Sequence, residues 1–582
     1  MIATGFGVSG ARDAMAEAET LERETGGAPW LSSYPAGIDW AARFEAKPLF
    51  ALLDAAVARF PEQRYLDFLD KPWTFRQVGR LVDRMARGLQ RQGVRRGTKV
   101  GLFLPNCPYF VVAFFATLKA GGTVVNYNPL SAEREIAQQI EDSETEIMVT
   151  LDLALLLPKL QPLLGRTRLK TIVVGRMADL LPLPKSLLFP LVKRAELAVV
   201  PDDRSHVLFT DLLAGRGRLM PVMIDPRGDV AVLQYTGGTT GVPKAAALTH
   251  QNLQINAEQI AAWYSGGAPG SERILGVLPL FHCFALSSVM LLSLCVGAEI
   301  VLLPRFELRQ LLRTITRKRV TVVPGVPTLF TAINNCAELD KHDLSSLRFC
   351  ISGGAPLPRE VKQEFERLAG CRLLEGYGLT EAPVVCCNPI VGREKPGSIG
   401  LPLPGTTIEV VSLEDRQTVL PPGQTGEICV RGPQVMGGYW GPSDDVGTRL
   451  HGGRLHTGDI GYLDEEGYGY IVDRLKQLII CSGYNVYPRA VEEAIHQHPA
   501  VAEVAVCGVP DEYRGESVKA YIVLRAGACL TGAELLAFLA DKLSPIQQPK
   551  LIEFREQLPK SAIGKILKKE LLREHLEGQH AA

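Results

Sequence analysis

The stretch that decides the fold runs from Lys99 to Pro129 and reads KVGLFLPNCPYFVVAFFATLKAGGTVVNYNP. Its opening, residues 99–106, is a short apolar run that ends in a polar turn. Residues 108–122 form a longer apolar run that ends at two glycines, and residues 123–129 form a second short run. The short runs indicate buried strands and the longer run a helix. A strand, a helix and a strand in this order predict a βαβ unit, and therefore a mostly parallel sheet.

Similar short apolar runs recur along the chain, and after about residue 395 the sequence pattern changes. RVTVVPG (319–325), LRFCISGGAP (347–356) and GCRLLEGYG (370–378) are short β-rich runs that each lead into a Gly/Pro loop. Such loops leave the carboxyl ends of strands, where open α/β sheets bind ligands. After about residue 395, GEICVRG (426–432) and GYGYIVDR (467–474) alternate as in antiparallel sheets. We therefore predict an α/β protein with layered α/β subdomains, a β-rich subdomain and a small α+β domain at the C-terminal end.

Length and composition narrow the class of protein. A chain of 582 residues is too long for one ordinary core, so two or more domains are expected. The formal net charge is zero, which gives no support to a nucleic-acid partner. The twelve cysteines contain no CxxC pair, which favours a reducing, cytoplasmic location. Residues 1–29 carry charges and no apolar core of a secretory signal, and are expected to be a poorly ordered extension.

Two apolar stretches raise the question of a membrane. Residues 274–298 contain no Asp, Glu, Lys or Arg and are long enough to span a bilayer, but Pro279 and His282 interrupt them. We interpret them as a loop followed by a fully buried helix. Residues 180–200, LLPLPKSLLFPLVKRAELAVV, place cations beside leucines and prolines. They are either a surface insertion packed on its own domain, which we favour, or a contact with the inner face of a membrane.

A loop rich in glycine and threonine follows a predicted strand in VLQYTGGTTGVPKAAALTH, residues 232–250. Its hydroxyls and backbone amides are suited to cradling phosphate oxygens, and Lys244 adds a positive charge. The loop lacks the Gly-Lys-Ser/Thr ending of the P-loop. Taken alone it is a weak signal, because many turns have this composition.

Four further segments carry groups that suit nucleotide chemistry. EGYGLTEAP (375–383) places Glu381 after a tight loop, and a carboxylate near phosphates usually holds Mg²⁺. The alternative is a capped turn with a solvated Glu381. Asp459 in HTGDIGY offers two acceptors for ribose hydroxyls. DRLKQ, residues 473–477, offers two cations, and Lys565 stands on a glycine-containing loop before a basic helix.

In this order and spacing, the motifs resemble the adenylate-forming enzymes, which include acyl-CoA synthetases, luciferases and nonribosomal adenylation domains. The resemblance covers about residues 30–572, and the likeness is greatest to bacterial long-chain fatty-acyl-CoA ligases. Further motifs that carry it are LPLFHCFAL, GSIGLPLPG, PQVMGGYW and SGYNVYP. Gly237-Gly238 replaces the Ser-Gly of many relatives, and Ala245 replaces their glycine. The resemblance implies an acid-thiol ligase that uses ATP and Mg²⁺ to make acyl-AMP, and then coenzyme A to make acyl-CoA and AMP.

The resemblance also implies domains and site residues. It divides the chain into an N-terminal AMP-binding domain (30–473), a hinge (474–477, with Lys476) and a mobile C-terminal lid domain (478–582). It implies catalytic roles for Lys565, His282 and Glu381, although a lone histidine among apolar residues is more often a core group. ATP and AMP would be held by Thr236, Gly237, Gly238, Thr239, Thr240, Gly241, Lys244, Gly354, Glu375, Gly376, Tyr377, Thr380, Asp459 and Arg474, Mg²⁺ by Thr236 and Glu381, and the thioester step would use Ser482, Gly483 and Tyr484.

The acyl end of the predicted site is apolar. Phe284, Val326, Gly353 and Ala355 would line a tunnel, and no cation stands among them. Each buried methylene contributes about 0.8 kcal/mol, which favours a long fatty acid over acetate. A medium-chain or aryl acid–CoA ligase, a fatty-acyl-AMP ligase that loads a carrier protein, and a catalytically silent nucleotide sensor remain alternatives. The expected partners are fatty acid, ATP and coenzyme A, with peripheral membrane contact and a homodimer left open.

Overall fold

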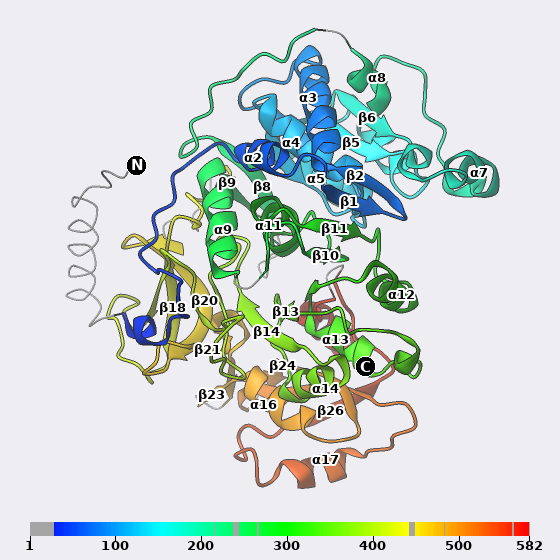
Figure 1. The fold of residues 1–582 in the computed structure, drawn as a ribbon. Helices are drawn as coiled ribbons and strands as arrows, with labels where there is room; N and C mark the ends of the chain where they lie inside the picture. The colour runs from blue at the N-terminus through cyan, green and yellow to red at the C-terminus, as the bar shows by residue number, and fades with distance from the viewer. Residues whose placement is uncertain are drawn as a thin grey trace, which may run out of the picture.

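The fold is that of a computed structural model, which describes residues 28–580 except 216, 237–243, 265–266, 442–448, 482–483, 512 and 562–563. Four sheets make up the molecule (Figure 1). Two large α/β sheets lie in the N-terminal part, a β-rich sheet lies beside them, and a fourth sheet belongs to the C-terminal part. This arrangement confirms the predicted fold class.

The first α/β sheet contains the βαβ unit with which the sequence argument began. Its strand order is β7-β6-β5-β3-β4-β8-β9, parallel throughout except for the last pair. Eleven of the twelve residues of α4 are buried, which explains its continuous apolar sequence. The strands are β3 (Lys99–Leu102), β4 (Thr123–Asn126), β5 (Thr145–Leu151), β6 (Thr171–Gly175), β7 (His206–Leu208), β8 (Val230–Tyr235) and β9 (Ala245–Thr249), and the helices are α3 (Phe75–Arg91), α4 (Pro108–Lys119), α5 (Glu133–Ser143), α6 (Leu157–Leu160), α7 (Lys185–Val192) and α8 (Phe209–Ala214).

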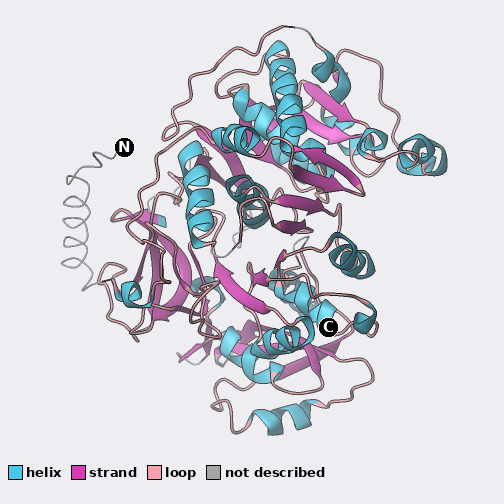
Figure 2. Ribbon diagram, viewed as in Figure 1, coloured by secondary structure: helices cyan, strands magenta, loops and turns pink. Residues whose placement is uncertain are grey.

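The second α/β sheet has the order β16-β15-β14-β13-β12-β10-β11-β1-β2. Its central strands are parallel, and the two edges are antiparallel. Figure 2 shows helices packed around its strands. Its elements are α2 (Ala51–Arg59), β1 (Arg64–Phe68), β2 (Lys71–Thr74), α9 (His250–Trp263), β10 (Arg273–Gly276), α10 (Cys283–Ala285), the π-helix η5 (Leu286–Leu291), α11 (Leu292–Val296), β11 (Glu299–Leu302), α12 (Leu308–Lys318), β12 (Val322–Gly325), α13 (Pro327–Asn334), β13 (Phe349–Ser352), α14 (Arg359–Ala369), β14 (Arg372–Tyr377), β15 (Cys386–Cys387) and β16 (Leu401–Pro402).

The two apolar stretches fold differently. Residues 274–298 form the end of β10, a loop and a run of buried helical turns, as predicted. In the described part of the chain, no helix combines the length and apolar character that a bilayer crossing requires. Residues 180–200 form an insertion whose first leucines, Leu180 and Leu181, are buried, whereas α7 has no buried residue.

The β-rich sheet and the C-terminal sheet follow in sequence. The β-rich sheet is antiparallel, as the alternating pattern predicts, and is made of β17 (Thr407–Val411), β18 (Gly426–Arg431), β19 (Leu450–His451), β20 (Arg454–Leu463) and β21 (Gly469–Arg474). The C-terminal part has two small cores of its own. It is made of β22 (Ile479–Cys481), β23 (Tyr484–Val486), α16 (Pro488–His496), β24 (Val501–Asp511), β25 (Gly515–Leu524), α17 (Gly532–Leu539), β26 (Leu551–Arg555) and α18 (Lys568–His580).

Short 3-10 helices complete the fold. The one that joins the last two sheets, η7 (Leu475–Gln477), lies within the segment predicted as a hinge. The first, η1, starts at Pro29, and its Trp30 is buried, while residues 1–27 of the predicted extension lie outside the described residues. The others are η2 (Gln161–Leu163), η3 (Met177–Leu180), η4 (Arg194–Glu196) and η6 (Leu339–Lys341).

Candidate active site

A cavity of about 1070 Å³ lies between the N-terminal sheets, the β-rich sheet and the C-terminal part. It receives the loops at the carboxyl ends of the parallel strands β13 and β14, where ligands of open α/β sheets bind. Most of the predicted site residues that the structure describes meet there. They are Thr236, Lys244, His282, Phe284, Gly353, Gly354, Gly376, Tyr377, Thr380, Glu381, Arg474, Lys476 and Lys565.

Other predicted residues do not line this cavity. Asp459 accepts from the Tyr377 hydroxyl, Glu375 Oε1 accepts from the Gly397 N–H at 3.1 Å, and Tyr484 is exposed on β23. Val326 and Ala355, predicted for the acyl tunnel, are also outside its lining. Gly237, Gly238, Thr239, Thr240, Gly241, Ser482 and Gly483 fall outside the described residues.

A tyrosine, a carboxylate and a guanidinium meet at one wall of the cavity. The Tyr377 hydroxyl donates to Asp459 Oδ2 at 2.6 Å, and Arg474 Nε donates to Asp459 Oδ1 at 2.8 Å. Asp459 and Arg474 are register partners on β20 and β21. Burial raises the pKa of the Tyr377 phenol well above its usual range, so the phenol stays a neutral donor. The carboxylate is thereby held in one orientation, with remaining lone pairs available to a ligand hydroxyl.

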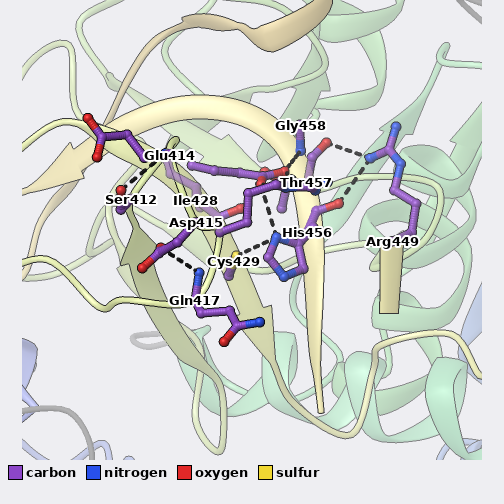
Figure 3. Close-up of polar contacts among 12 residues, drawn as sticks. Ser412, Glu414, Asp415, Gln417, Ile428, Cys429, Arg449, His456, Thr457 and Gly458 are labelled. Atoms are coloured by element: carbon purple, nitrogen blue, oxygen red, sulfur yellow. Dashed lines mark hydrogen bonds and ion pairs between the residues drawn. The ribbon is translucent and has the colours of Figure 1, made fainter. Parts of the chain in front are cut away.

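The part of β20 that precedes Asp459 is bonded to a polar cluster that includes Cys429, His456 and Gly458 (Figure 3). His456 Nδ1 lies 2.9 Å from Glu427 Oε2 and 3.3 Å from the sulfur of Cys429. The backbone N–H of Gly458 donates to Glu427 Oε1, and Arg416 Nε donates to Oε2. Within the described ranges, Glu427, Cys429 and His456 form the one group of three residues whose ligand atoms are close enough to hold a metal ion. Because Arg416 and Gly458 already use the carboxylate, the cluster is a hydrogen-bonded support rather than an open metal site.

Lys565 enters the cavity from the C-terminal part of the chain. Its backbone N–H donates to Ser561 Oγ at 3.2 Å, and its carbonyl accepts from the Ser561 N–H at 2.8 Å, which closes a tight loop. The preceding Gly564 has φ +78° and its carbonyl accepts from Thr328 Oγ1 at 3.4 Å, on the N-terminal side of the cavity. The positive charge of Arg474, together with burial, lowers the pKa of the Lys565 amine to about 8.

His282 lies in the same cavity in a neutral state. Its Nδ1 accepts from the Phe284 N–H at 3.4 Å and so caps the first turn of α10. We infer that Nε2 carries the proton, because a neutral imidazole that accepts at one nitrogen donates at the other. Burial, aided by the charge of Lys565, lowers the pKa of His282 to about 4. The residue is therefore a half-buried, neutral donor at neutral pH.

The predicted metal ligands, Thr236 and Glu381, both line the cavity near Lys244 and Tyr439. Glu381 is 7% exposed, and its Oε1 accepts from the Tyr439 hydroxyl at 2.6 Å. Lys244 Nζ lies 5.9 Å from the centre of the same ring, and the Thr236 hydroxyl donates to the Lys244 carbonyl at 3.2 Å. A carboxylate and a hydroxyl are hard ligands that suit Mg²⁺. The donor set thus fits the ion that the sequence resemblance implies.

Sequence reasoning missed three groups of residues around this cavity. Tyr439 follows a glycine pair in PQVMGGYW, a motif that was quoted but given no chemical role. Asn126, Gln139, Asp142 and Gln234 are polar lining residues. The mostly apolar part of the lining, which we call the apolar arm, consists of Ile260, Trp263, Tyr264, Ser288, Leu292, Ile351 and Ile390. The helical pattern of α9 gives no signal that separates a side chain facing the core from one facing a cavity.

The family of the chain follows from comparison with known proteins. The family model of the AMP-binding enzyme matches residues 53–440. That of the AMP-binding enzyme C-terminal domain matches residues 490–565. The chain therefore belongs to the AMP-binding enzyme family.

Individual relatives agree along nearly the whole chain. A long-chain-fatty-acid–CoA ligase of Bacillus subtilis (strain 168) is 43% identical over 556 residues, 95% of this chain and 99% of the relative. Among solved structures, the anthranilate CoA ligase AuaEII in complex with anthranoyl-AMP has a TM-score of 0.81 at 26% identity, covering 95% of this chain and 99% of its own. ATP-bound MatB from Rhodopseudomonas palustris has a TM-score of 0.79 at 28% identity, covering 91% and 98%.

Proposed function

We propose that this protein is an ATP-dependent long-chain fatty acid–CoA ligase. It joins a fatty acid to ATP, forming acyl-AMP and pyrophosphate, and then transfers the acyl group to coenzyme A with release of AMP. The observation that carries the proposal is the placement of Lys565 in one cavity with the phosphate-loop residues Thr236 and Lys244 and an apolar arm. The 43% identity to a long-chain-fatty-acid–CoA ligase over 95% of the chain supports the substrate class.

Adenylation needs positioning and positive charge rather than a side-chain nucleophile. A carboxylate oxygen of the fatty acid attacks the α-phosphorus, and the bond from that phosphorus to pyrophosphate breaks. Lys565 and His282 would face the developing negative charge, as a cation and a neutral donor held in place before the reaction. Asp459 and Arg474 would hold the ribose. Thr236 and Glu381 would hold Mg²⁺, whose charge neutralises the phosphates.

Thioester formation follows at the same acyl carbon. The sulfur of coenzyme A attacks the carbonyl of acyl-AMP, the thiol gives up its proton, and AMP leaves. Lys565 occupies the cavity in the described arrangement, so a thiol arriving from that side would need the C-terminal part to move. We infer that the structure corresponds to the adenylation step, with domain boundaries at residues 30–473 and 478–582.

The apolar arm gives the acyl chain its place. α9 contributes Ile260 and Trp263, and α11 contributes Leu292. Each methylene that leaves water for such a surface contributes about 0.8 kcal/mol, so long chains gain most. Of the four residues predicted for the acyl tunnel, Phe284 and Gly353 line the same cavity.

The test is release of AMP from ATP with oleate, with and without coenzyme A. We expect AMP and oleoyl-CoA only when all three substrates are present, with less product from acetate, octanoate and benzoate. Lys565→Ala should lower the rate by about 10²–10³. AMP release with no fatty acid would overturn the proposal, and acyl-AMP that accumulates in the presence of coenzyme A without forming oleoyl-CoA would identify an acyl-AMP ligase instead.

We also infer a cytoplasmic location with peripheral contact at the inner face of the membrane. ATP and coenzyme A are substrates in water, whereas a long fatty acid partitions into lipid. No residue of α7 is buried, and its leucines are exposed, which supports such a contact.

A further inference from the structure

The helix α7 exposes an apolar sequence that nothing in the described chain covers. Five of its eight residues, KSLLFPLV, are apolar, yet none is buried. Leu187, Leu191 and Val192 are 69%, 76% and 73% exposed. In Figure 1 the helix stands at the right-hand edge of the molecule. Exposed leucines are ordinary when single, but a contiguous set marks an interaction surface.

The exposed side chains form rows rather than a scatter. Leu187 and Leu191 are spaced four residues apart in α7, as are Leu188 and Val192, so each pair lies along one side of the helix, and the exposed Leu183 precedes it. All five are more than half exposed. The rows place one apolar face on the outside of the protein.

The residues on both sides of α7 are attached to the rest of the N-terminal part. Leu180 and Leu181 are buried before the helix. After it, residues 196–198 pair with residues 152–154 through the N–H of Ala154 and that of Ala198. Leu155 and Val199, which adjoin this pairing, are also exposed, at 79% and 87%. The insertion is thus fixed at both ends, while α7, between them, remains exposed.

Positive charge borders the apolar face. Lys185 is the first residue of α7, and Lys193 and Arg194 follow its last. Lys185 also lines a second cavity of about 640 Å³, where its Nζ lies 3.8 Å from Asp70 Oδ2. The charged residues lining that cavity are five cations (Lys185, Arg313, Arg317, Lys318 and Lys341) and three carboxylates (Asp67, Asp70 and Glu307), an excess of positive charge.

We propose that this apolar face, defined by Leu183, Leu187, Leu188, Leu191 and Val192, is the surface by which the protein rests on an anionic phospholipid bilayer. The apolar side chains enter the acyl-chain boundary, and the bordering cations face headgroup phosphates. The inference rests on the proposed function in one respect: the fatty acid substrate itself partitions into bilayers.

Charge complementarity favours a lipid surface over a second copy of the chain. In a twofold dimer through α7, the same patch meets itself. Lys193 is paired with Glu196 Oε1 at 2.5 Å, but Lys185 and Arg194 of the two copies would approach one another, which costs free energy, whereas an anionic lipid surface attracts both.

The experiment is flotation of the full-length protein with vesicles of phosphatidylethanolamine and phosphatidylglycerol. We expect binding by the wild type and at least about a tenfold lower partition coefficient for the double variant Leu187→Glu/Leu191→Glu. The matched control is Met220→Glu/Met223→Glu, which makes the same charge change at side chains 64% and 91% exposed on the segment between α8 and β8. That control should bind as the wild type does.

A second pair tests the charged border. Lys185→Gln/Arg313→Gln should remove roughly twenty-five-fold of the preference for anionic vesicles over phosphatidylcholine vesicles, at about fivefold for each cation. Its binding to phosphatidylcholine should not change. Activity on octanoate, measured without vesicles, should be that of the wild type in all these variants, so a failure of the ligase proposal would show separately.

Three outcomes would overturn the inference. The first is a wild type that does not float with anionic vesicles. The second is binding of the Leu187/Leu191 variant at the level of the Met220/Met223 control. The third is a wild-type dimer in light scattering that becomes a monomer in Leu187→Glu/Leu191→Glu, with no vesicle binding by either, which would assign the face to a second copy.

Discussion

The charge of Lys565 sets a pH limit on adenylation. Because Arg474 and burial lower its pKa to about 8, the amine is protonated below that pH and loses its charge above it. We expect kcat/KM for pyrophosphate release to fall with a limb near pH 8. In Lys565→Arg the guanidinium stays charged, so this limb should disappear even though the overall rate is lower. The same limb in both proteins would contradict the role.

His282 should support adenylation without changing its protonation state between pH 5.5 and 7.5. Its pKa of about 4 keeps the ring neutral from pH 5 upward. His282→Asn retains a side chain suited to capping α10 but removes the Nε2 donor, and should slow adenylation by about 10². Pyrophosphate release followed from pH 5.5 to 7.5 should give parallel profiles for the two proteins. A wild-type limb near pH 6.5 that the variant lacks would show that the ring titrates.

At this scale the sequence predicts residues that sit in recognisable motifs, and little else. Lys565, Glu381 and Arg474 were assigned from motif order and do meet in one cavity. Tyr439 and Trp263 were not assigned, although both line it. An aromatic residue after glycines, or at the end of a helix, looks the same in sequence whether it packs in the core or against a ligand. Its neighbours in space determine which of the two environments it has.

Among the elements, the loop before α18 is fixed by one close backbone contact. A Cβ on Gly564 would stand 2.5 Å from Thr328 Oγ1, and its φ of +78° disfavours a side chain. Gly564→Ala should therefore displace Lys565 and lower adenylation by tenfold or more. Gly527→Ala is the matched control, because Gly527 has the same φ and no atom within 4 Å.

Both variants share the backbone strain of alanine at positive φ, which costs about 1 kcal/mol. Their melting temperatures should therefore fall together, while pyrophosphate release should fall only in Gly564→Ala. Equal rates in the two variants would mean that the contact with Thr328 does not position Lys565.

The π-helical turn η5 (Leu286–Leu291) should influence which fatty acid chain lengths the enzyme prefers. Ser288 lies within it and lines the cavity. Ser288→Phe should fill part of the apolar arm and expel methylenes at about 0.8 kcal/mol each, roughly fourfold per methylene. The ratio of kcat/KM for palmitate to that for octanoate should fall at least tenfold. Ser288→Ala, which adds no bulk, should leave the ratio unchanged, and an unaltered ratio in Ser288→Phe would place the acyl chain elsewhere.

On the scale of the whole molecule, periodicity predicts the elements but not their partners. The βαβ unit at residues 99–129 and the antiparallel region after residue 395 are as expected. The pairing of β1 (Arg64–Phe68) with β11 (Glu299–Leu302) was not predicted, because it joins strands more than two hundred residues apart. Local patterns specify which face of a strand is apolar, whereas the neighbour depends on packing of the complete chain.

Local sequence patterns also do not predict how the N-terminal and C-terminal parts of the chain are placed relative to each other. The sequence resemblance implies a hinge at residues 474–477, and the structure has a 3-10 helix, η7, at that point. Beyond it, Arg489 donates from its backbone N–H to Asp473 Oδ2 at 2.9 Å and from Nη1 to the Ile471 carbonyl at 2.6 Å. These contacts, with Lys565 in the cavity, define one arrangement of the C-terminal part. For the proposed thiol step we expect a second arrangement, reached by backbone rotation near residue 476.

Lys476→Pro tests that requirement. A 3-10 helix has φ near −50 to −70°, which proline also adopts, so the substitution is compatible with the present arrangement and opposes rotation away from it. We expect pyrophosphate release within about tenfold of the wild type, and conversion of supplied oleoyl-AMP to oleoyl-CoA slower by about 10² or more. Lys476→Ala separates loss of the side chain, which lines the cavity, from restriction of the backbone, and should affect the two half-reactions alike. If Lys476→Pro slowed both steps equally, a rotation at this residue between the half-reactions would have to be abandoned.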